Sequence, residues 1–470
     1  MLMSTLTIQT IETVLKKTIS RCPVCRKQKP AEVVKVVRSG REQVIMRRHC
    51  PCHGTHDFVI SSDARFYWLA QGNPINHSCG CGPTCSPASD GGKEGYLGDN
   101  ALNEAKKGTA EKLSTCLALI EIVDSCNLAC PTCFTDSPVG VSGPRLKYHN
   151  FANITGRIQG VLDRKGHIEI LQFSGGEPTI HPEFFQLAEW VRSNPKIDYL
   201  LINTNGIRFA KDEAFVQEMG SLFQKFDKIQ LYLQFDGPQE EGQVELRGAD
   251  LRDMREKAIR NCERIGLPIT FAMTVNERNL KYVWDTVEYA RQFDHVRGVS
   301  FQPMFLSGRV PSANLGETLS QPITSADIIL GLNEQSSGTV SLDDFTPLPC
   351  GDPNCSTIGW LFRVNGKYFS PSAFNIDIPA LQASLPDKIN YDIEDLKKCG
   401  CDDTALGDLM KSLEVKESNA FRLFIKPFMD ARTWDEDRID RCCTHVIRPD
   451  GKLDSFCRYY FGAPAENTCC

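Results

Sequence analysis

The sequence predicts an α/β fold in which buried parallel strands alternate with helices, wound either as a barrel or as an open sheet. From Leu117 onward, short apolar runs of strand length recur, and longer segments with a helical period lie between them. About six such strand–helix units fit between residues 117 and 310. A small cysteine-bearing ribbon precedes this array, and a cysteine-rich segment follows it.

The composition is that of a globular chain. Its 470 residues are 41% hydrophobic, which is enough for a large core or for several domains. The net charge of −6 is small and no long basic run occurs, so no nucleic-acid partner is expected. No apolar stretch reaches the roughly 18 residues that span a bilayer, and no signal peptide is recognisable. We expect a cytoplasmic protein, with peripheral membrane contact left open, since a soluble enzyme can take a lipid from the membrane surface.

Changes in composition divide the chain into four predicted parts. These are a metal ribbon (1–75), a cysteine-rich loop (76–116), the strand–helix array (117–310) and a C-terminal cysteine-bearing domain (311–470). Within the second part, residues 86–111 are rich in Gly, Ser, Ala and charge and lack an apolar period. This pattern indicates a surface insertion or linker.

The 21 cysteines are the most informative feature of the composition. An odd count without a secretion signal, together with clustering, favours metal ligation over disulfides. In the ribbon, CPVC (22–25) and CPCH (50–53) flank two β-like runs, as in zinc ribbons and rubredoxin knuckles. Four thiolates suit zinc or a mononuclear iron, so a structural zinc and an electron-carrying iron both stay open.

Three further thiols directly follow the first strand, in CNLACPTCF. Cys126, Cys130 and Cys133 are one thiolate short of a closed four-ligand site, but a [4Fe–4S] cluster held by three thiolates leaves one iron open to another ligand. The ends of the next three strands carry SGGEPT (174–179), NTNG (203–206) and FDG (235–237). Because the C-terminal ends of parallel strands meet at one edge, a single site is expected there.

The CxxxCxxC motif, the aromatic Phe134 immediately beyond it, and GGEP after the second strand closely resemble the radical S-adenosylmethionine (radical SAM) enzymes. The resemblance implies a partial (β/α)6 radical SAM barrel. It also implies that the three cysteines hold a [4Fe–4S] cluster whose fourth iron binds S-adenosylmethionine. Reduction, by a donor such as ferredoxin or flavodoxin, would then give methionine and a 5′-deoxyadenosyl radical that abstracts hydrogen from the substrate.

The same resemblance assigns further cofactor contacts. Gly175, Gly176, Glu177 and Pro178 match the motif whose backbone meets the methionine amino group, an approach that the missing Cβ atoms permit. Asn203 and Asn205 are either ribose or carboxylate contacts or caps of a turn. Gln234, Asp236 and Gln302 are expected to point into the same cavity.

Outside the array, the N-terminal ribbon, the cysteine-rich loop and the C-terminal CCTHVIRPDGKLDSFCRYY resemble the branch that contains archaeal tetraether lipid synthase and the class D radical methylases. This resemblance implies a rubredoxin-like mononuclear iron and two auxiliary [4Fe–4S] clusters. The mononuclear site is assigned to Cys22, Cys25, Cys50 and Cys52, with His53 as the substitute for Cys52. One auxiliary cluster is assigned to Cys79, Cys81, Cys85 and Cys116, and the other to Cys350, Cys355, one of Cys442 and Cys443, and Cys457. Cys399, Cys401, Cys469 and Cys470 are left over, and Cys262 is interpreted as a small buried hydrophobe.

The branch resemblance makes carbon–carbon bond formation between lipid tails the leading function. The alternatives are radical methylation of a small heterocycle such as a pterin, peptide maturation, and an iron–sulfur electron carrier that is not an enzyme. Lipid use requires a long apolar tunnel beside the cluster, and pterin use requires a compact polar pocket. Peptide use requires a leader-binding module, which the ribbon does not resemble, and a carrier has no use for GGEP beside an incomplete ligand set.

Overall fold

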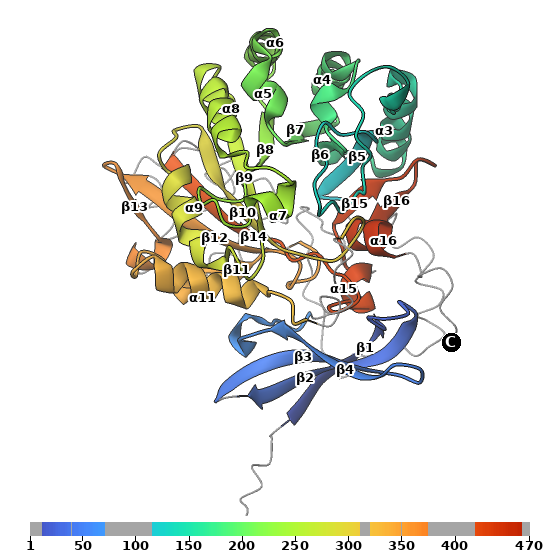
Figure 1. Ribbon diagram of the computed structural model, residues 1–470, viewed down its shortest axis with the longest axis vertical. Helices are drawn as coiled ribbons and strands as arrows, with labels where there is room; N and C mark the ends of the chain where they lie inside the picture. Colours follow the sequence, from blue (N-terminus) through green and yellow to red (C-terminus); the bar gives the residue numbers. More distant parts are fainter. Residues whose placement is uncertain are drawn as a thin grey trace, which may run out of the picture.

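The computed structural model describes residues 12–38, 40–70, 115–310, 320–348, 350–374 and 419–462. A four-stranded sheet, blue in Figure 1, lies beside a twelve-stranded sheet that carries helices on its outer side. The predicted insertion and several predicted ligands lie outside the described residues: 86–111, Cys79, Cys81, Cys85, Cys399, Cys401, Cys469 and Cys470. Among the described residues, no helix has the length and apolarity needed to cross a membrane.

The N-terminal ribbon is an antiparallel sheet with strand order β1-β2-β3-β4. Its strands are β1 (Glu12–Arg21), β2 (Gln28–Arg38), β3 (Arg41–Cys50) and β4 (Gly54–Ser61). The two β-like runs of the sequence are β2 and β3, whereas β1 is mostly exposed or half-buried and lacks an apolar signal. The CPVC and CPCH motifs lie in the β1–β2 and β3–β4 turns, so strand pairing brings them to the same end of the sheet.

The centre of the large sheet is a row of six parallel strands, which confirms the predicted α/β fold. They are β5 (Leu117–Val123), β6 (Ile168–Gly175), β7 (Ile197–Thr204), β8 (Ile229–Gln234), β9 (Ile269–Val275) and β10 (Val296–Pro303). The helices between them are α3 (Phe151–Lys165), α4 (Phe184–Ser193), α5 (Ile207–Lys211), α6 (Glu213–Lys225), α7 (Gln243–Arg247), α8 (Arg252–Arg264) and α9 (Val283–Ala290). Each strand pairs in parallel with the next along the chain.

The two faces of these strands differ in chemistry. Side chains that point outward, such as Ile120 and Phe173, are fully buried in one apolar core with the helices. Because side chains alternate along a strand, the positions between them point into the barrel. Many of these inward positions are amides or hydroxyls, among them Gln172, Gln230 and Tyr232.

The C-terminal segment adds strands to both edges of this row. On one edge β14 (Ala420–Ile425) is parallel to β10, and on the other β15 (Thr444–Ile447) is parallel to β5. The strands farther out are β11 (Thr346–Pro347), β12 (Thr357–Val364), β13 (Lys367–Phe369) and β16 (Leu453–Ser455). The helices of this segment are α11 (Ser325–Gln335), α15 (Glu436–Asp440) and α16 (Phe456–Phe461). The segment that the sequence assigns to a separate domain is therefore continuous with the barrel sheet.

Buried polar contacts fix the ribbon against residues 431–437. Lys16 forms ion pairs with Asp435 at 2.7 Å and Asp437 at 3.0 Å. The guanidinium of Arg48, which is 1% exposed, donates to the carbonyl oxygens of Ala431 and Arg432 at 2.7 and 3.1 Å. These contacts hold the ribbon in one position relative to the barrel.

Candidate functional site

The three cysteines of the CxxxCxxC motif lie in the loop after β5, which we call the cluster loop (Cys126–Cys133). They line a cavity of ≈ 140 Å³, the cofactor cavity, at the C-terminal ends of the barrel strands. The three sulfurs do not all lie within 4.8 Å of one another. A single zinc, with metal–sulfur bonds of about 2.3 Å, would hold its sulfurs about 3.8 Å apart. The wider spacing fits a cluster of several irons rather than one ion.

The segment after β10 holds the cluster loop in place. The backbone N–H groups of Cys133 and Arg309 donate to each other's carbonyl oxygens at 3.0 and 2.8 Å, and the Arg309 guanidinium donates to the Cys130 carbonyl at 3.0 Å. Gly308 has a φ of +63°, and a Cβ there would lie 2.3 Å from the Cys133 oxygen. Sequence reasoning missed Arg309, because the strand-end motifs stop short of it.

The GGEP turn packs directly on the backbone of the cluster loop. The N–H of Gly176 donates to Val123 O at 2.8 Å, and the N–H of Glu177 donates to Ser125 O at 3.1 Å. A Cβ on Gly175 would lie 2.0 Å from Val123 O, and one on Gly176 would lie 2.1 Å from Ser125 O. Both glycines line the cofactor cavity, but the close approach that requires them is between two loops of this chain.

The Glu177 carboxylate joins the ends of β6 and β7. It is 1% exposed and accepts hydrogen bonds from Thr179 Oγ1 at 2.6 Å, Thr204 Oγ1 at 2.7 Å and Asn205 N at 2.8 Å. Burial raises the pKa of Glu177, and these hydrogen bonds oppose the shift. Pro178 begins a one-turn helix (Pro178–Ile180) and does not line the cofactor cavity. The internal hydrogen bonds explain why an acidic residue is placed in this turn.

The predicted polar contacts divide into cavity-facing and structural groups. Phe134, Asn203, Gln234 and Gln302 line the cofactor cavity. Asn205 lines it too, but its Oδ1 accepts from the N–H of Ile207 at 3.0 Å and its Nδ2 donates to Asn127 Oδ1 at 2.6 Å. Asn205 therefore caps a turn, which is one of its two predicted roles.

Asp236 is not in the cofactor cavity, contrary to the prediction. It is 1% exposed, and its carboxylate accepts two hydrogen bonds from Arg247, at 2.7 and 2.9 Å, and one from Thr274 N at 3.0 Å. Arg247 lines the cavity in its place. Burial raises the pKa of the Cys130 thiol, and the Arg247 guanidinium opposes this shift. Arg247 was not predicted, since it lies on α7 rather than in a strand-end motif.

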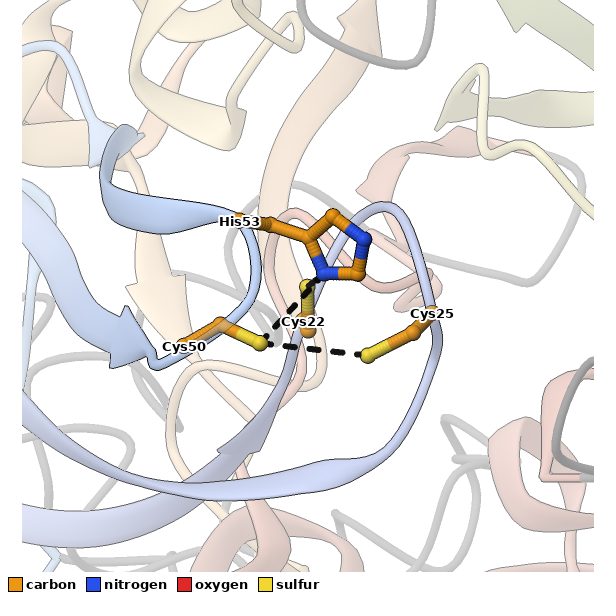
Figure 2. Close-up of side chains that lie close together, drawn as sticks. All are labelled: Cys22, Cys25, Cys50 and His53. Carbon is orange, nitrogen blue, oxygen red and sulfur yellow. Dashed lines mark hydrogen bonds between the residues drawn. The ribbon is translucent and has the colours of Figure 1, made fainter. Parts of the chain in front are cut away.

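The ribbon holds a compact group of three cysteines and one histidine (Figure 2). The ligand atoms of Cys22, Cys25, Cys50 and His53 all lie within 4.8 Å of one another. His53 Nδ1 is 3.4 Å from the Cys50 sulfur and 3.6 Å from the Cys22 sulfur. The His53 N–H donates to Cys50 O at 3.1 Å, and this turn returns residue 53 to the site while Cys52 stays exposed at its tip. The preferred prediction of Cys52 was therefore wrong, and its substitute His53 takes the position.

Three cysteines and a histidine form one of the donor sets of structural zinc sites, whereas rubredoxin-type iron takes four thiolates. We expect His53→Ala to lower the zinc content of the purified protein and Cys52→Ser to leave it unchanged. Metal analysis by mass spectrometry measures both. Zinc loss in Cys52→Ser without zinc loss in His53→Ala would show that Cys52, not His53, is the ligand.

A second thiol group lies at the edge of the barrel. Cys116, Cys350 and Cys443 are buried, with all three sulfurs within 4.8 Å of one another. This differs from the predicted sets, which placed Cys116 and Cys350 in different clusters. Cys116 precedes β5 and Cys443 precedes β15, and the parallel pairing of these strands places the two residues side by side, with Cys116 N donating to Cys443 O at 3.1 Å.

That group does not include the sulfurs of Cys355, Cys442 and Cys457. Arg438 Nε donates to the Cys355 sulfur at 3.2 Å, and Met429 N donates to the Cys457 sulfur at 3.4 Å. Burial raises the pKa of Cys355 and of Cys442 to about 12 and that of Cys457 to about 11, and nearby thiolates add to each shift. Cys262 lies in the apolar core on α8, where the sequence places it.

A second cavity, of ≈ 150 Å³, occupies the interior of the barrel, and we call it the barrel cavity. It shares Phe134, Asn203, Gln234, Gln302 and Phe305 with the cofactor cavity, so the two adjoin. Its polar lining includes Gln172, Tyr199, Gln230, Tyr232, Thr270 and Ser300. Alternate residues of the strands supply this lining, and the alternating Gln and Tyr of IQLYLQ (229–234) are the sequence signal of it.

Within the barrel cavity, cross-strand hydrogen bonds order much of the polar lining. Tyr232 donates to Ser300 Oγ at 2.5 Å and accepts from Gln302 Nε2 at 2.7 Å. Gln230 donates to Thr270 Oγ1 at 2.5 Å. These pairs leave carbonyl oxygens and hydroxyls fixed around a small space.

Comparisons with known proteins cover both the ribbon and the barrel. The model of the radical SAM superfamily matches residues 120–290, and that of the HMPTM N-terminal zinc ribbon domain matches residues 14–62. The 7,8-dihydro-6-hydroxymethylpterin dimethyltransferase of Methanocaldococcus jannaschii is 27% identical over 94% of this chain and 93% of its own length. The GTP 3′,8-cyclase of Syntrophomonas wolfei is 27% identical over 39% of this chain and 55% of its own length. Among solved structures, SuiB of Streptococcus suis with S-adenosylmethionine is 17% identical, with a TM-score of 0.36 over 48% of this chain and 47% of that chain.

The superfamily match runs from β5 to α9, so it includes five of the six strands of the barrel row together with the cluster loop and the GGEP turn. The spacing of the three sulfurs fits an iron–sulfur cluster, and the amide of Asn203 and the guanidinium of Arg247 line the adjoining cavity. Residues 120–290 therefore match the radical SAM superfamily, and the placement of the three cysteines and the GGEP turn around one cavity agrees with that match.

Proposed function

We propose that this enzyme abstracts hydrogen from a carbon of a small polar heterocycle, such as a pterin, in the course of its methylation. The observation that carries the proposal is the small barrel cavity, which places amides and hydroxyls among apolar side chains and adjoins the cofactor cavity. S-adenosylmethionine on a reduced cluster supplies a radical that attacks unactivated carbon. The residues of this chain bind the substrate, orient it and exclude water.

The size of the barrel cavity favours a small ring system. At ≈ 150 Å³ it is similar to the engineered cavity of about 150 Å³ that takes up one benzene molecule. A fused heterocycle that also extends into the cofactor cavity fits this scale. Two long lipid tails exceed it.

The polar lining favours a substrate with hydrogen-bonding edges. Gln172 is 8% exposed and its amide makes no hydrogen bond within the described part of the chain. An amide left without a partner when a ligand displaces water from the cavity costs about 1–3 kcal/mol, so ligands that pair with it are favoured over ligands that do not. A pterin ring presents alternating donors and acceptors along one edge, as such an amide requires. The name of the Methanocaldococcus jannaschii relative supports the same substrate class.

Carbon–carbon coupling between lipid tails is the second candidate, and one observation favours it. An aromatic cluster lies where the two cavities meet, with Phe428 and Phe456 stacked at 4.1 Å and Phe134 edge-on to Tyr460 at 4.8 Å. Such a surface suits an alkyl chain as well as a ring. For either substrate we propose a cytoplasmic enzyme served by an electron donor such as ferredoxin or flavodoxin.

An anaerobic assay separates these candidates. Protein reconstituted with iron and sulfide is given S-adenosylmethionine, dithionite and carbon-deuterated 7,8-dihydro-6-hydroxymethylpterin. We expect pterin-dependent release of 5′-deoxyadenosine that carries deuterium, detected by mass spectrometry, and a loss of about tenfold or more in Gln172→Leu. The exposed variant Gln217→Leu on α6 is the matched control. Deuterium transfer from tail-labelled phospholipid, with none from the pterin, would overturn the proposal in favour of lipid coupling.

A further inference from the structure

Lys426 is a buried cation in the wall of the barrel cavity. It is 9% exposed, and its Nζ donates to Thr444 Oγ1 at 2.9 Å. Its ammonium also lies 5.8 Å from the centre of the Phe428 ring and interacts electrostatically with the thiols of Cys350, Cys442, Cys443 and Cys457. Among the described residues, no carboxylate lies within ion-pair distance of this ammonium group. Because burying an unpaired charge is strongly unfavourable, an anion is expected to lie near it.

The position of Lys426 connects the two edges of the barrel row. Its N–H donates to Phe301 O at 2.9 Å, which continues the pairing of β14 with β10, while Thr444 is the first residue of β15. The Lys426–Thr444 hydrogen bond therefore links the end of β14 to the start of β15. Since Thr444 is neutral, it orients the ammonium without cancelling its charge.

We propose that Lys426 binds an anionic substituent, a phosphate or a carboxylate, on the heterocycle that the barrel takes up. The proposal rests on the function proposed above. An ammonium has three N–H donors, and Thr444 uses one, so two are available to an oxyanion. The unpaired amide of Gln172 lines the same cavity and is available to the ring. The cavity therefore offers separate groups for the charged and the neutral part of one ligand.

The same ammonium also acts on the nearby thiols, which is the competing explanation for its burial. Its charge opposes the raised pKa of Cys350 and Cys442 and contributes to the lowered pKa of Cys443. If Lys426 serves only to balance thiolates, its removal will disturb the metal content of the protein and will not change the choice of ligand.

Binding by the full-length, anaerobically reconstituted protein tests the proposal. The probes are 6-hydroxymethylpterin and its phosphate monoester, titrated by their own fluorescence. We expect the ester to bind the wild type about tenfold or more tightly than the neutral pterin. Lys426→Met should remove this difference without weakening the neutral pterin, Lys426→Arg should keep most of it, and the exposed control Lys452→Met should keep all of it.

Iron content and the binding of inorganic phosphate separate the remaining explanations. Equal affinities of the wild type for the two probes, or a preference that persists in Lys426→Met, would overturn the anion site. Loss of iron in Lys426→Met, with the preference unchanged in the remaining holoprotein, would assign the lysine to the thiols and also overturn it. If neither pterin binds, the proposed function fails. The anion site is then judged by ³¹P line broadening of inorganic phosphate, which must occur in the wild type and be lost in Lys426→Met.

Discussion

Cys133→Ala is expected to lose about four irons per chain and to stop S-adenosylmethionine cleavage, because a cubane cluster held by three thiolates does not survive on two. The loop itself should stay folded, since the hydrogen bonds between Cys133 and Arg309 are formed by backbone atoms. Iron and sulfide analysis measures the loss. In the wild type, added S-adenosylmethionine should change the electron paramagnetic resonance spectrum of the reduced protein, and the variant should lack this response.

Cys262→Ala is the matched control for this experiment. Cys262 is fully buried on α8, away from the cysteine groups, and its replacement removes a sulfur without touching a proposed ligand. Its iron content and spectrum should equal those of the wild type. Full iron content in Cys133→Ala, with the cofactor response intact, would show that the cluster loop does not hold the cluster.

Asp236→Asn is expected to lower the free energy of unfolding by about 3–5 kcal/mol, the usual cost of removing one partner from a buried ion pair. The carboxylate lies 2.7 Å from Arg247 and 3.5 Å from Arg255, and all three side chains are at most 10% exposed. The variant leaves two buried guanidinium groups without a counter-charge. Urea denaturation followed by circular dichroism measures the change.

Asp250→Asn provides a surface comparison. Asp250 pairs with Arg252 at 2.6 Å, but these side chains are 38% and 35% exposed, so the expected loss is at most about 1 kcal/mol. Similar losses in the two variants would show that the Asp236 pair is effectively hydrated and carries little of the stability of the barrel.

The Asp236 pair also predicts an acid-sensitive barrel. Burial opposes ionisation of Asp236, but the charges of Arg247 and Arg255 outweigh it, so its pKa is lowered on folding. A carboxyl with a lowered pKa contributes its full stabilisation above the unfolded value of about 3.9 and loses it as the pH falls through the folded value. The stability of the wild type should therefore fall below about pH 4 through this group, and that part of the fall should be absent in Asp236→Asn.

The barrel could be predicted because its signals are local. Apolar runs of strand length, helical periods between them and motifs at successive strand ends all depend on neighbouring residues, and β5 to β10 follow them in order. The cluster loop is local for the same reason, since three thiols within eight residues need no distant partner.

Other parts of the site depend on pairings that no local pattern records. Cys116 meets Cys443 because β5 pairs with β15, more than three hundred residues later. His53 rather than Cys52 joins the ribbon group because a single turn decides which side chain points inward. The prediction for Asp236 was wrong because its ion-pair partner Arg247 lies on a helix rather than at a strand end. An aspartate in a buried ion pair and an aspartate that contacts a cofactor also look the same in a sequence.

The late position of β15 in the chain has a consequence for biosynthesis. A chain leaves the ribosome from its N-terminus, so the cluster loop and β5 to β10 are synthesised well before β14 and β15. The group of Cys116, Cys350 and Cys443 is completed only when residue 443 has emerged and β15 has added to β5. Any metal held by this group must therefore be inserted after synthesis of the chain is nearly finished, whereas the zinc-ribbon site is complete after little more than fifty residues.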